Sequence, residues 1–433
     1  MSVTTMERPV ELSSPEHRRA RVYGFVFLGM ALLIVLLFAL GSHPGQTTTF
    51  VLNPGAESQV IRVPDLSFPT LPVLWAFALI GAFLGGWQLA RGFRRVNLVL
   101  AVVAGLFVLA FLGWAARGNS LNLTGLLSSA LLRATPIALA GLSGVLCERA
   151  AVINIAIEGM LLAGAFSAAL FGSLSLNVWG WPEWASVAFG LAAGILSGAL
   201  LGLLLAVMAV RFKVDQIIAG TAINILATGI TSFLSARILA QFLELNNTAI
   251  LDSAPIPLLS KIPVIGPVFF EQNLLVYVLY VLVLVIHVML FYTRWGLRTR
   301  AVGEHPKAAD TLGINVFLTR YVNVTLGGMV AGLGGAFLIL GSVGRFDELM
   351  TAGRGFIGLA AMIFGKWMPF GTWGAALIFG FADSLQTKLA ILEVPIPSQF
   401  LQMAPYLVTM IVLAGVVGRA EPPAADGQPY EKQ

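Results

Sequence analysis

Charged residues are scarce in this 433-residue chain. Asp, Glu, Lys and Arg together make up 11% of it, where soluble globular domains carry about 25%. Hydrophobic residues make up 58%, and the mean hydropathy is +0.87. A soluble protein of this composition would expose large apolar patches to water and aggregate. The composition therefore excludes a soluble protein.

Cysteine and histidine are also rare. Cys147 is the single cysteine, which excludes an intramolecular disulfide and a thiol cluster for metal. No G-x-x-x-x-G-K-[S/T] motif occurs, because Gly365-Lys366 is followed by Trp367, so the chain lacks a P-loop for nucleotide phosphates. We predict no cofactor, no metal site and no catalytic residue, also because the histidines lie far apart without ligand spacing: His17, His43, His287 and His305.

Long apolar runs dominate the chain instead. A helix that spans the hydrocarbon core needs about 20 apolar residues. Runs of this kind occupy 23–40, 72–90, 96–116, 123–146, 151–173, 184–210, 215–240, 274–292, 319–343, 370–388 and 400–418. The apolar piece 355–366 is too short to span and predicts a broken helix, which membranes tolerate only where protein or a water-filled cavity covers it. The fold class predicted is an all-α polytopic membrane protein with 11–12 helical segments.

The basic residues predict the orientation of these segments. With the N-terminus inside, most of the 26 Lys and Arg residues fall in inner connections, which places both termini in the cytoplasm and the chain in the plasma (inner) membrane. The net charge of +5 therefore reflects topology and not a nucleic-acid surface. The predicted division is a cytoplasmic segment 1–22, N-terminal helices 23–120, a core 121–418 and a disordered, Pro-rich cytoplasmic tail 419–433.

Small residues and an internal echo predict how the helices pack. Glycines recur at four-residue spacing, which lets helices approach closely in lipid: Gly81/Gly85, Gly194/Gly198/Gly202 and Gly328/Gly332. Gly141-Leu142-Ser143-Gly144 and Gly332-Leu333-Gly334-Gly335 each begin a span, a broken segment and a second span. This echo predicts an inverted repeat of the kind found in many transporters.

Three polar connections stand out. The outer connections 41–71 and 241–273 are long, either as plain surface loops or as docking surfaces for an external protein. In the inner connection 294–318, Pro306 suits the first turn of a short helix 307–312 that Gly313 then ends. Ala308 and Ala309 give this helix a small face that could seat in a groove of a cytoplasmic partner. The alternative is a charged loop that only satisfies the positive-inside rule.

Four stretches in order carry a family resemblance across residues 120–418: Glu148–Met160, Asp215–Asn224, Arg298–Ile314 and Gly353–Trp367. Together they resemble permease subunits of ABC importers of the branched-chain amino acid and simple-sugar class, the nucleoside/simple-sugar branch in particular. The third stretch is similar to that family's coupling loop. His305 stands where the family usually has Asn, and Ala151 and Ala156 replace expected glycines.

The resemblance implies inward transport of a small polar solute, a nucleoside or simple sugar, with energy delivered through loop 294–318. It implies a cytoplasmic ABC ATPase subunit, a second homologous permease (or a second copy of this chain) and an external substrate-binding protein as partners. The coupling-loop residues it implies are Arg298, Gly303, Glu304, Pro306, Ala308, Ala309 and Gly313.

Polar side chains inside spans are candidates for the translocation pathway, because burying them in lipid is expensive. They are Asn154, Glu158, Asn224, Asp383 and Gln386. Asn154 and Glu158 are four residues apart and would share a helix face. Glu158 fits either a pathway role or a hydrogen bond at a break in its own helix. We expect Asn224 and Asp383 to form interhelical hydrogen bonds, and Arg133 and Arg237 to snorkel to the outer surface.

Two other classes compete with this assignment. An ion- or proton-coupled secondary transporter would use Glu158 and Asp383 as coupling sites. An intramembrane serine protease would use Ser143 within Gly-Leu-Ser-Gly and His287 as its base. The sequence disfavours the protease, because His287 is followed by Val-Met-Leu and not by the glycines that such enzymes use for close helix approach.

Overall fold

A computed structural model describes residues 14–53, 63–392, 400, 403 and 420–432 of the chain. The chain forms two compact units. The first comprises Met1–Thr124 with Ile391–Val394, and the second comprises Gly125–Ala390 with Pro395–Gln433. Each unit has a hydrophobic core of its own.

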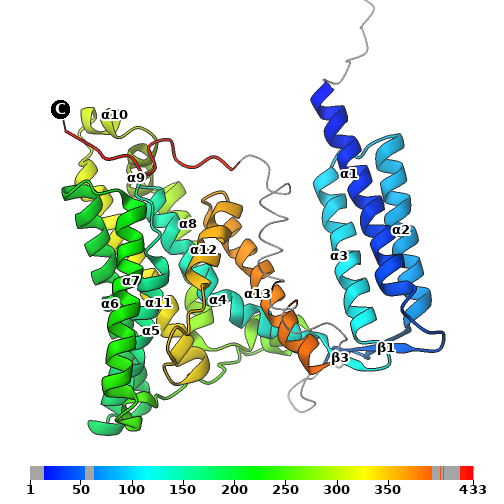
Figure 1. Ribbon diagram of the computed structural model, residues 1–433, viewed down its shortest axis with the longest axis horizontal. Helices are drawn as coiled ribbons and strands as arrows, with labels where there is room; N and C mark the ends of the chain where they lie inside the picture. Colours follow the sequence, from blue (N-terminus) through cyan, green and yellow to red (C-terminus); the bar gives the residue numbers. More distant parts are fainter. Residues whose placement is uncertain (1–13, 54–62, 393–399, 401–402, 404–419, 433) are drawn as a thin grey trace, which may run out of the picture. The chain divides into compact units, whose positions relative to one another are not determined.

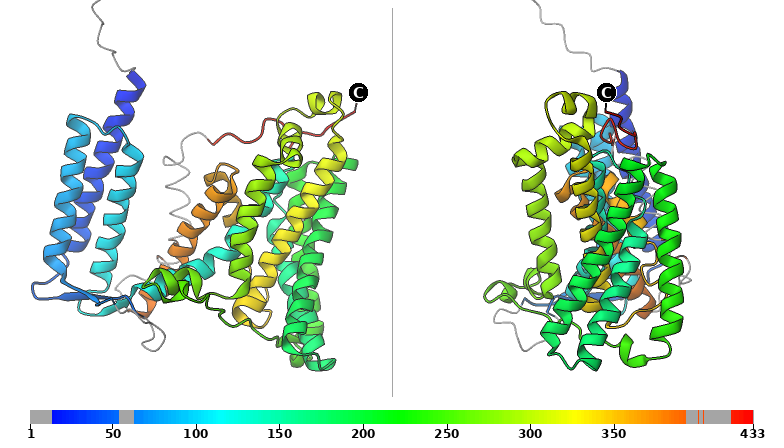
Figure 2. Two further views of the ribbon diagram at one scale, coloured as in Figure 1. Left: turned by 180° about the vertical axis from the view of Figure 1, so that it is seen from behind. Right: turned by 90° about the vertical axis from the view of Figure 1, so that its left-hand side faces the viewer.

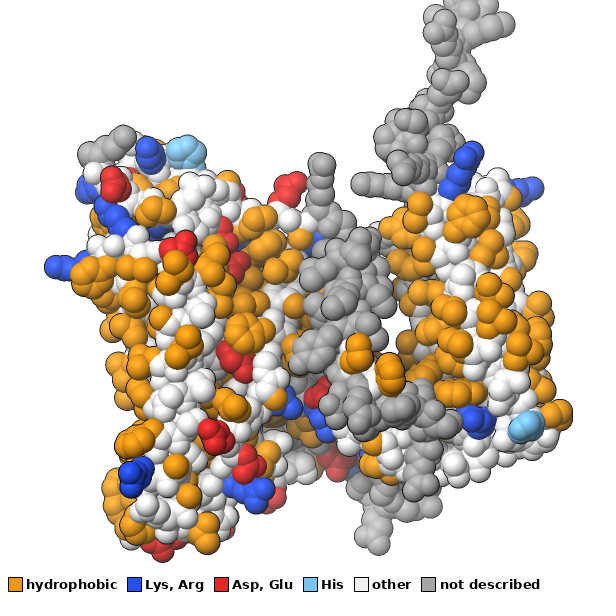
Figure 3. All heavy atoms as spheres, in the orientation of Figure 1, with side chains coloured by type: hydrophobic (Ala, Val, Ile, Leu, Met, Phe, Trp, Pro, Cys, Tyr) orange, Lys and Arg blue, Asp and Glu red, His pale blue; other side chains and the backbone are white. Residues whose placement is uncertain are grey.

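The first unit contains three long helices: α1 (Ser14–Leu33, continued by a π-helical turn Ile34–Ala39), α2 (Thr70–Ala90) and α3 (Val96–Ala115) (Figure 1). Phe38, Leu74 and Ala110 meet in its core. The predicted close approach at Gly85 is confirmed, because a Cβ there would lie 3.0 Å from the backbone nitrogen of Leu28 on α1. Figure 3 shows hydrophobic side chains over the outward faces of these helices, as lipid contact requires.

A small sheet ends the first unit, in strand order β2-β1-β3. Strand β1 (Thr47–Val51) pairs antiparallel with β2 (Leu66–Pro69) and parallel with β3 (Ser120–Asn122). The Thr48 hydroxyl donates a hydrogen bond to the Gly113 carbonyl of α3, at 2.9 Å. The connection 41–71, expected as a loop, thus contains two strands, consistent with the β-branched Thr-Thr-Thr-Phe-Val run of β1.

The second unit is helical. Its long helices are α4 (Leu123–Glu148, which starts in the first unit), α5 (Ile157–Ser173), α6 (Glu183–Ala206), α7 (Gln216–Leu234), α8 (Leu274–Tyr292), α11 (Val316–Leu338) and α13 (Pro369–Ile391). The shorter helices are α9 (Arg294–Glu304), α10 (Pro306–Thr311) and α12 (Arg354–Phe364). π-Helical turns cover Leu174–Val178, Val207–Arg211, Ser235–Leu239, Gly266–Phe270 and Ile339–Val343, and 3₁₀ turns cover Leu243–Asn246 and Leu259–Lys261.

Nine helices of the described residues are long and apolar enough to cross a membrane. These confirm the all-α polytopic class and eight of the predicted spans, while the ninth, predicted at 151–173, begins later than expected. Helix α13 matches the predicted span 370–388, although it is too polar to count among the nine. The predicted span 400–418 lies outside the described residues, apart from Phe400 and Met403.

Glycines bring α5, α6 and α11 into direct backbone contact, as Figure 2 shows for their side-by-side course. A Cβ on Gly198 would overlap the carbonyl oxygen of Gly328, and one on Gly332 would overlap that of Gly194. A Cβ on Gly164 would likewise overlap Gly332. The predicted glycine spacings on α6 and α11 are therefore confirmed as one packing interface.

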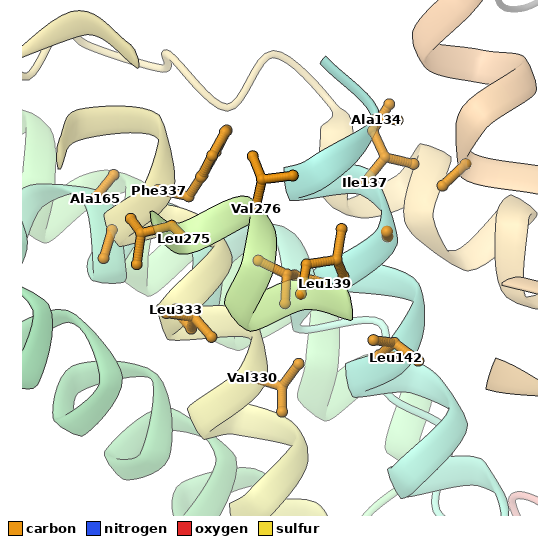
Figure 4. Packing of buried hydrophobic residues seen from close by; sticks show 14 of the residues in the cluster. Ala134, Ile137, Leu139, Leu142, Ala165, Leu275, Val276, Val330, Leu333 and Phe337 are labelled. Carbon is orange, nitrogen blue, oxygen red and sulfur yellow. The ribbon is translucent and has the colours of Figure 1, made fainter. Parts of the chain in front are cut away.

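The main hydrophobic core lies among α4, α5, α8 and α11 (Figure 4). Leu139 and Leu142 of α4, Val276 of α8, and Leu333 and Phe337 of α11 lie in it, all almost completely buried. The Gly-Leu-Ser-Gly stretch of α4 packs against α12 and α13, because a Cβ on Gly141 would overlap their atoms. This core fixes α4 and α11, the helices that lead into the two interruptions of the unit.

The first interruption corrects one predicted span. The apolar run 151–173 was expected to be one helix, but α4 ends at Glu148 and α5 begins at Ile157. Between them Ala151 takes a φ of 62°, outside the helical region. The second interruption follows α11, and the predicted broken helix is confirmed as α12. The inverted repeat itself remains a prediction.

Candidate functional site

Side chains of α7 satisfy the non-helical backbone between α4 and α5. Gln216 Oε1 accepts a hydrogen bond from the Ile153 N–H at 2.7 Å. Asn224 Oδ1 accepts from the Gly159 N–H at 2.7 Å, while its Nδ2 donates to the Ile155 carbonyl at 2.9 Å. Irregular backbone at membrane depth requires such partners. Asn224 thus forms the interhelical hydrogen bonds expected of it, whereas Gln216 was not singled out from the sequence.

Glu158 holds the start of α12. Its Oε1 accepts from the Gly353 N–H at 2.8 Å, and its Oε2 accepts from the Gly355 N–H at 2.6 Å. A carboxylate at a helix N-terminus satisfies free backbone donors and matches the helix dipole. A Cβ on Gly355 would lie 2.7 Å from the Glu158 backbone, so only glycine fits there. Glu158 therefore forms hydrogen bonds at a helix break. The helix that it caps is α12, however, and not its own helix α5, as the sequence analysis expected.

Asp383 on α13 forms ion pairs with two arginines. Its Oδ2 lies 3.0 Å from Arg133 Nη1 of α4 and 3.9 Å from Arg354 Nη2 of α12. Arg133 also donates to the Thr387 hydroxyl at 3.0 Å. Arg133 thus has a carboxylate within direct reach, and its snorkelling to the outer surface stays a prediction. Gln386 lies half-buried on α13, three residues from Asp383.

Asn154 is fully buried in the interruption before α5. Its Nδ2 lies 3.3 Å from Cys147 Sγ and 3.5 Å from Ser143 Oγ. Because Asn154 precedes the helix, the shared helix face predicted with Glu158 is wrong. In the described residues Asn154 therefore packs inside the protein and does not face an open path.

Ser143 and His287 do not form a nucleophile and base. Ser143 is fully buried and its hydroxyl lies near the Asn154 amide. His287 contacts aromatic rings, with its ring centre 4.8 Å from that of Phe370 and 5.1 Å from that of Phe291. The protease alternative has no geometric support in the described part of the chain.

A pair of short helices, α9 and α10, forms one end of the second unit (Figure 1). His305 separates them, and its Nδ1 accepts from the Ala308 N–H at 3.2 Å. Imidazole thus performs the N-cap role for which the family usually has Asn. Pro306 occupies the first turn of α10, and Gly313 follows it with a φ of 81°, as predicted for a helix stop.

The two alanines of α10 differ in exposure. Ala308 is exposed, but Ala309 is 2% exposed and packs with Val302 and Val316. The expectation that both alanines form one partner-facing surface is therefore wrong, because they are adjacent and lie about 100° apart around a helix. Leu312, 80% exposed, extends the free surface that Ala308 begins.

The remaining residues implied for the coupling loop also divide into exposed and buried positions. Arg298 and Glu304 are exposed on α9, whereas Gly303 is buried where a Cβ would overlap the Arg149 carbonyl oxygen. Burial lowers the pKa of Arg149, and the nearby Glu304 carboxylate opposes this shift. Composition predicted a disordered tail, yet residues 420–432 lie along α9 as an extended segment (Figures 1 and 2).

Comparison with known proteins identifies the second unit. A family model described as the permease component of the branched-chain amino acid transport system matches residues 126–417. The chain belongs to this family. The match begins one residue after the first residue of the second unit, so the three-helix unit before it lies outside the family match.

Curated relatives give the same assignment for this permease. It is 42% identical over 315 residues to the nucleoside ABC transporter permease protein NupC of Lactococcus lactis, covering 71% of this chain and 96% of the relative. It is 40% identical over 306 residues to the guanosine ABC transporter permease protein NupQ of Bacillus subtilis, covering 70% and 95%. The putative glucose permease TsgC13 of Haloferax volcanii is 30% identical over 319 residues, covering 69% and 93%. No solved structure gives a significant match.

Proposed function

We propose that this permease carries nucleosides inward across the plasma membrane and that a separate ABC ATPase drives it by docking on α10. The observation that carries the proposal is the exposed surface formed by α10 and by Leu312 directly after it, where Ala308 and Leu312 are exposed while Ala309 is buried. A short helix that is buried on one side and exposes small and apolar residues beside the polar Lys307 and Thr311 on the other fits a groove-bound coupling element.

Charge distribution supports an inner location for α10. Lys and Arg gather in the connections that share its side of the predicted topology, so the positive-inside rule predicts that α9, α10 and both termini are cytoplasmic. An ATPase in the cytosol would then meet α10 directly. The outer connections 41–71 and 241–273 would face an external substrate-binding protein.

Identity supports nucleosides over sugars as the substrate class. The two nucleoside and guanosine relatives are 40–42% identical to this chain, against 30% for the putative glucose permease. A nucleoside is polar and uncharged, so its path needs hydrogen-bonding groups and not a fixed counter-charge. We propose that Asp383 and Gln386, both half-buried, line this path, whereas Glu158, Asn224 and Asn154 support the interrupted helices beside it.

The partners follow from the same assignment. We expect one ATPase subunit per α10, an external binding protein, and a second permease that is either a homologue or another copy of this chain.

Co-purification and uptake test the proposal together. The tagged full-length chain is extracted from its native membrane in mild detergent, its partners are identified by mass, and the complex is reconstituted in liposomes with tritiated guanosine. We expect a stoichiometric P-loop ATPase and uptake that requires ATP and resists a protonophore. Uptake without ATP that the protonophore abolishes would overturn the proposal and establish the secondary transporter instead.

A further inference from the structure

The C-terminal segment Ala420–Lys432 is ordered, although its sequence predicts disorder. Its composition is polar and Pro-rich, yet Pro423, Ala425 and Tyr430 are buried. It has no helix or strand of its own, so its order comes from contacts with the rest of the second unit. These contacts fall on two different parts of that unit.

One set of contacts holds the segment to α9 and α10. The Ala425 N–H donates to the Gly303 carbonyl at 3.0 Å, and the Ala424 N–H donates to Glu304 Oε2 at 3.2 Å. Tyr430 lies in a cluster with Val302 and Ala309, and its ring centre is 5.4 Å from that of Phe317. The buried face of α10, at Ala309, therefore rests directly on the tail.

The other set reaches the interruption between α4 and α5. The carboxyl group of Asp426 lies beside that of Glu148, the last residue of α4. Gly427, at a φ of 74°, lies against Ile153, with 2.7 Å between a Cβ built there and Ile153 Cδ1. Arg320 Nη1 of α11 donates to the Gln428 carbonyl at 3.0 Å.

A further ion pair ties the end of the segment to the connection before α7. Lys213 Nζ lies 2.5 Å from Glu431 Oε1. The segment α7 then supplies Gln216 and Asn224, which hold the backbone of the same interruption. The tail thus touches both α10 and the elements that set the conformation of residues 149–156.

Resting on the proposed function, we propose that this tail is a positioning strap that transmits movement of α9 and α10 to the interrupted stretch 149–156. Gly303 marks the junction, because a Cβ there would meet both the Arg149 carbonyl oxygen and, at 3.5 Å, the Pro423 Cβ. Without the strap, α10 would still present Ala308 to the ATPase, but the contacts at Gly427 and Gln428 would no longer carry its displacement to the α4–α5 stretch.

Tyr430 is the residue on which to test the strap. Tyr430→Ala removes the ring that packs against Phe317 in the cluster with Ala309, whereas Tyr430→Phe keeps the ring and loses only the hydroxyl. A chain that ends at residue 419 removes the whole segment. Lys432→Ala, at an exposed site, is the matched control.

The assay is the complex in liposomes, with tritiated guanosine uptake and ATP hydrolysis measured in the same preparation. For Tyr430→Ala and the shortened chain we expect the ATPase to co-purify as in wild type and hydrolysis to stay within twofold. Uptake per ATP should fall at least tenfold. Tyr430→Phe and Lys432→Ala should both stay within twofold of wild type in that ratio.

Two results would overturn the strap. Uptake per ATP within twofold of wild type in Tyr430→Ala would show that the tail transmits nothing. Loss of the co-purifying ATPase would make the tail a docking element and not a strap. If the shortened chain fails to accumulate, the two Tyr430 variants decide. Failure of the wild-type complex to use ATP would instead refute the proposed function, whatever the tail does.

Discussion

Glu158→Gln is the single substitution that tests most directly how the start of α12 is held in this permease. The carboxylate of Glu158 accepts the N–H groups of both Gly353 and Gly355 at the start of α12. Glutamine keeps one acceptor oxygen but presents an NH₂ group to the second N–H. Since hydrogen bonds to charged groups contribute about 1.5–3 kcal/mol each, losing one and weakening the other should cost about 3 kcal/mol.

This loss should be visible as a fall in thermal stability. At roughly 2 °C per kcal/mol for a unit of this size, the apparent Tm of the purified chain should drop by about 6 °C. Uptake should fall at least tenfold, because α12 loses its link to α5. Glu244→Gln makes the same chemical change at an exposed glutamate and should leave both unchanged. A Tm within 1 °C of wild type together with normal uptake would refute the reasoning.

Three further predictions follow from the packing and the charges. Gly198→Leu should separate α6 from α11 and abolish monodisperse elution in fluorescence-detected chromatography. Ala308→Glu should lower uptake per ATP without changing Tm, whereas Ala309→Glu should lower Tm because it buries a carboxylate. Burial raises the pKa of Asp426 above that of a free carboxyl group, so its protonated form favours the docked tail and docking weakens as the pH rises from 5 to 7. A dye at Lys432→Cys should lose anisotropy over that range, and Asp426→Asn should reduce the change.

The spans could be predicted from the sequence because a membrane demands one property, apolarity over about 20 residues. Apolarity does not predict the helix interruption at 149–156. Residues 151–156 are mostly apolar and would read equally well as helix, so hydropathy could not reveal that Ala151 leaves the helical region. The sequence signal for the interruption lies in Gln216 and Asn224. Their side-chain amides cost free energy on the membrane helix α7 unless they form hydrogen bonds, and both bond to backbone N–H groups at the interruption.

For the tail 420–432 the sequence predicts disorder, but the segment is ordered. Composition alone favoured disorder, because few of its residues are apolar. One aromatic ring, Tyr430, docks against Val302 and Ala309, more than 110 positions earlier, and such long-range contacts leave no local pattern. Similarly, the pairing of Arg133 with Asp383 joins two distant helices, and only the positions of α4 and α13 reveal it.

The intramembrane carboxylates argue for a pump driven from outside the membrane-spanning region. An ion-coupled carrier needs a carboxylate that gains and loses its ion in each cycle. If Glu158 were protonated in each cycle, one of its two oxygens would become a donor, and α12 would lose an N-terminal partner every time. Asp383 would have to release Arg133 and Arg354 together. Neither group is therefore suited to ion coupling, and in the proposed mechanism α9, α10 and the tail supply the part that moves.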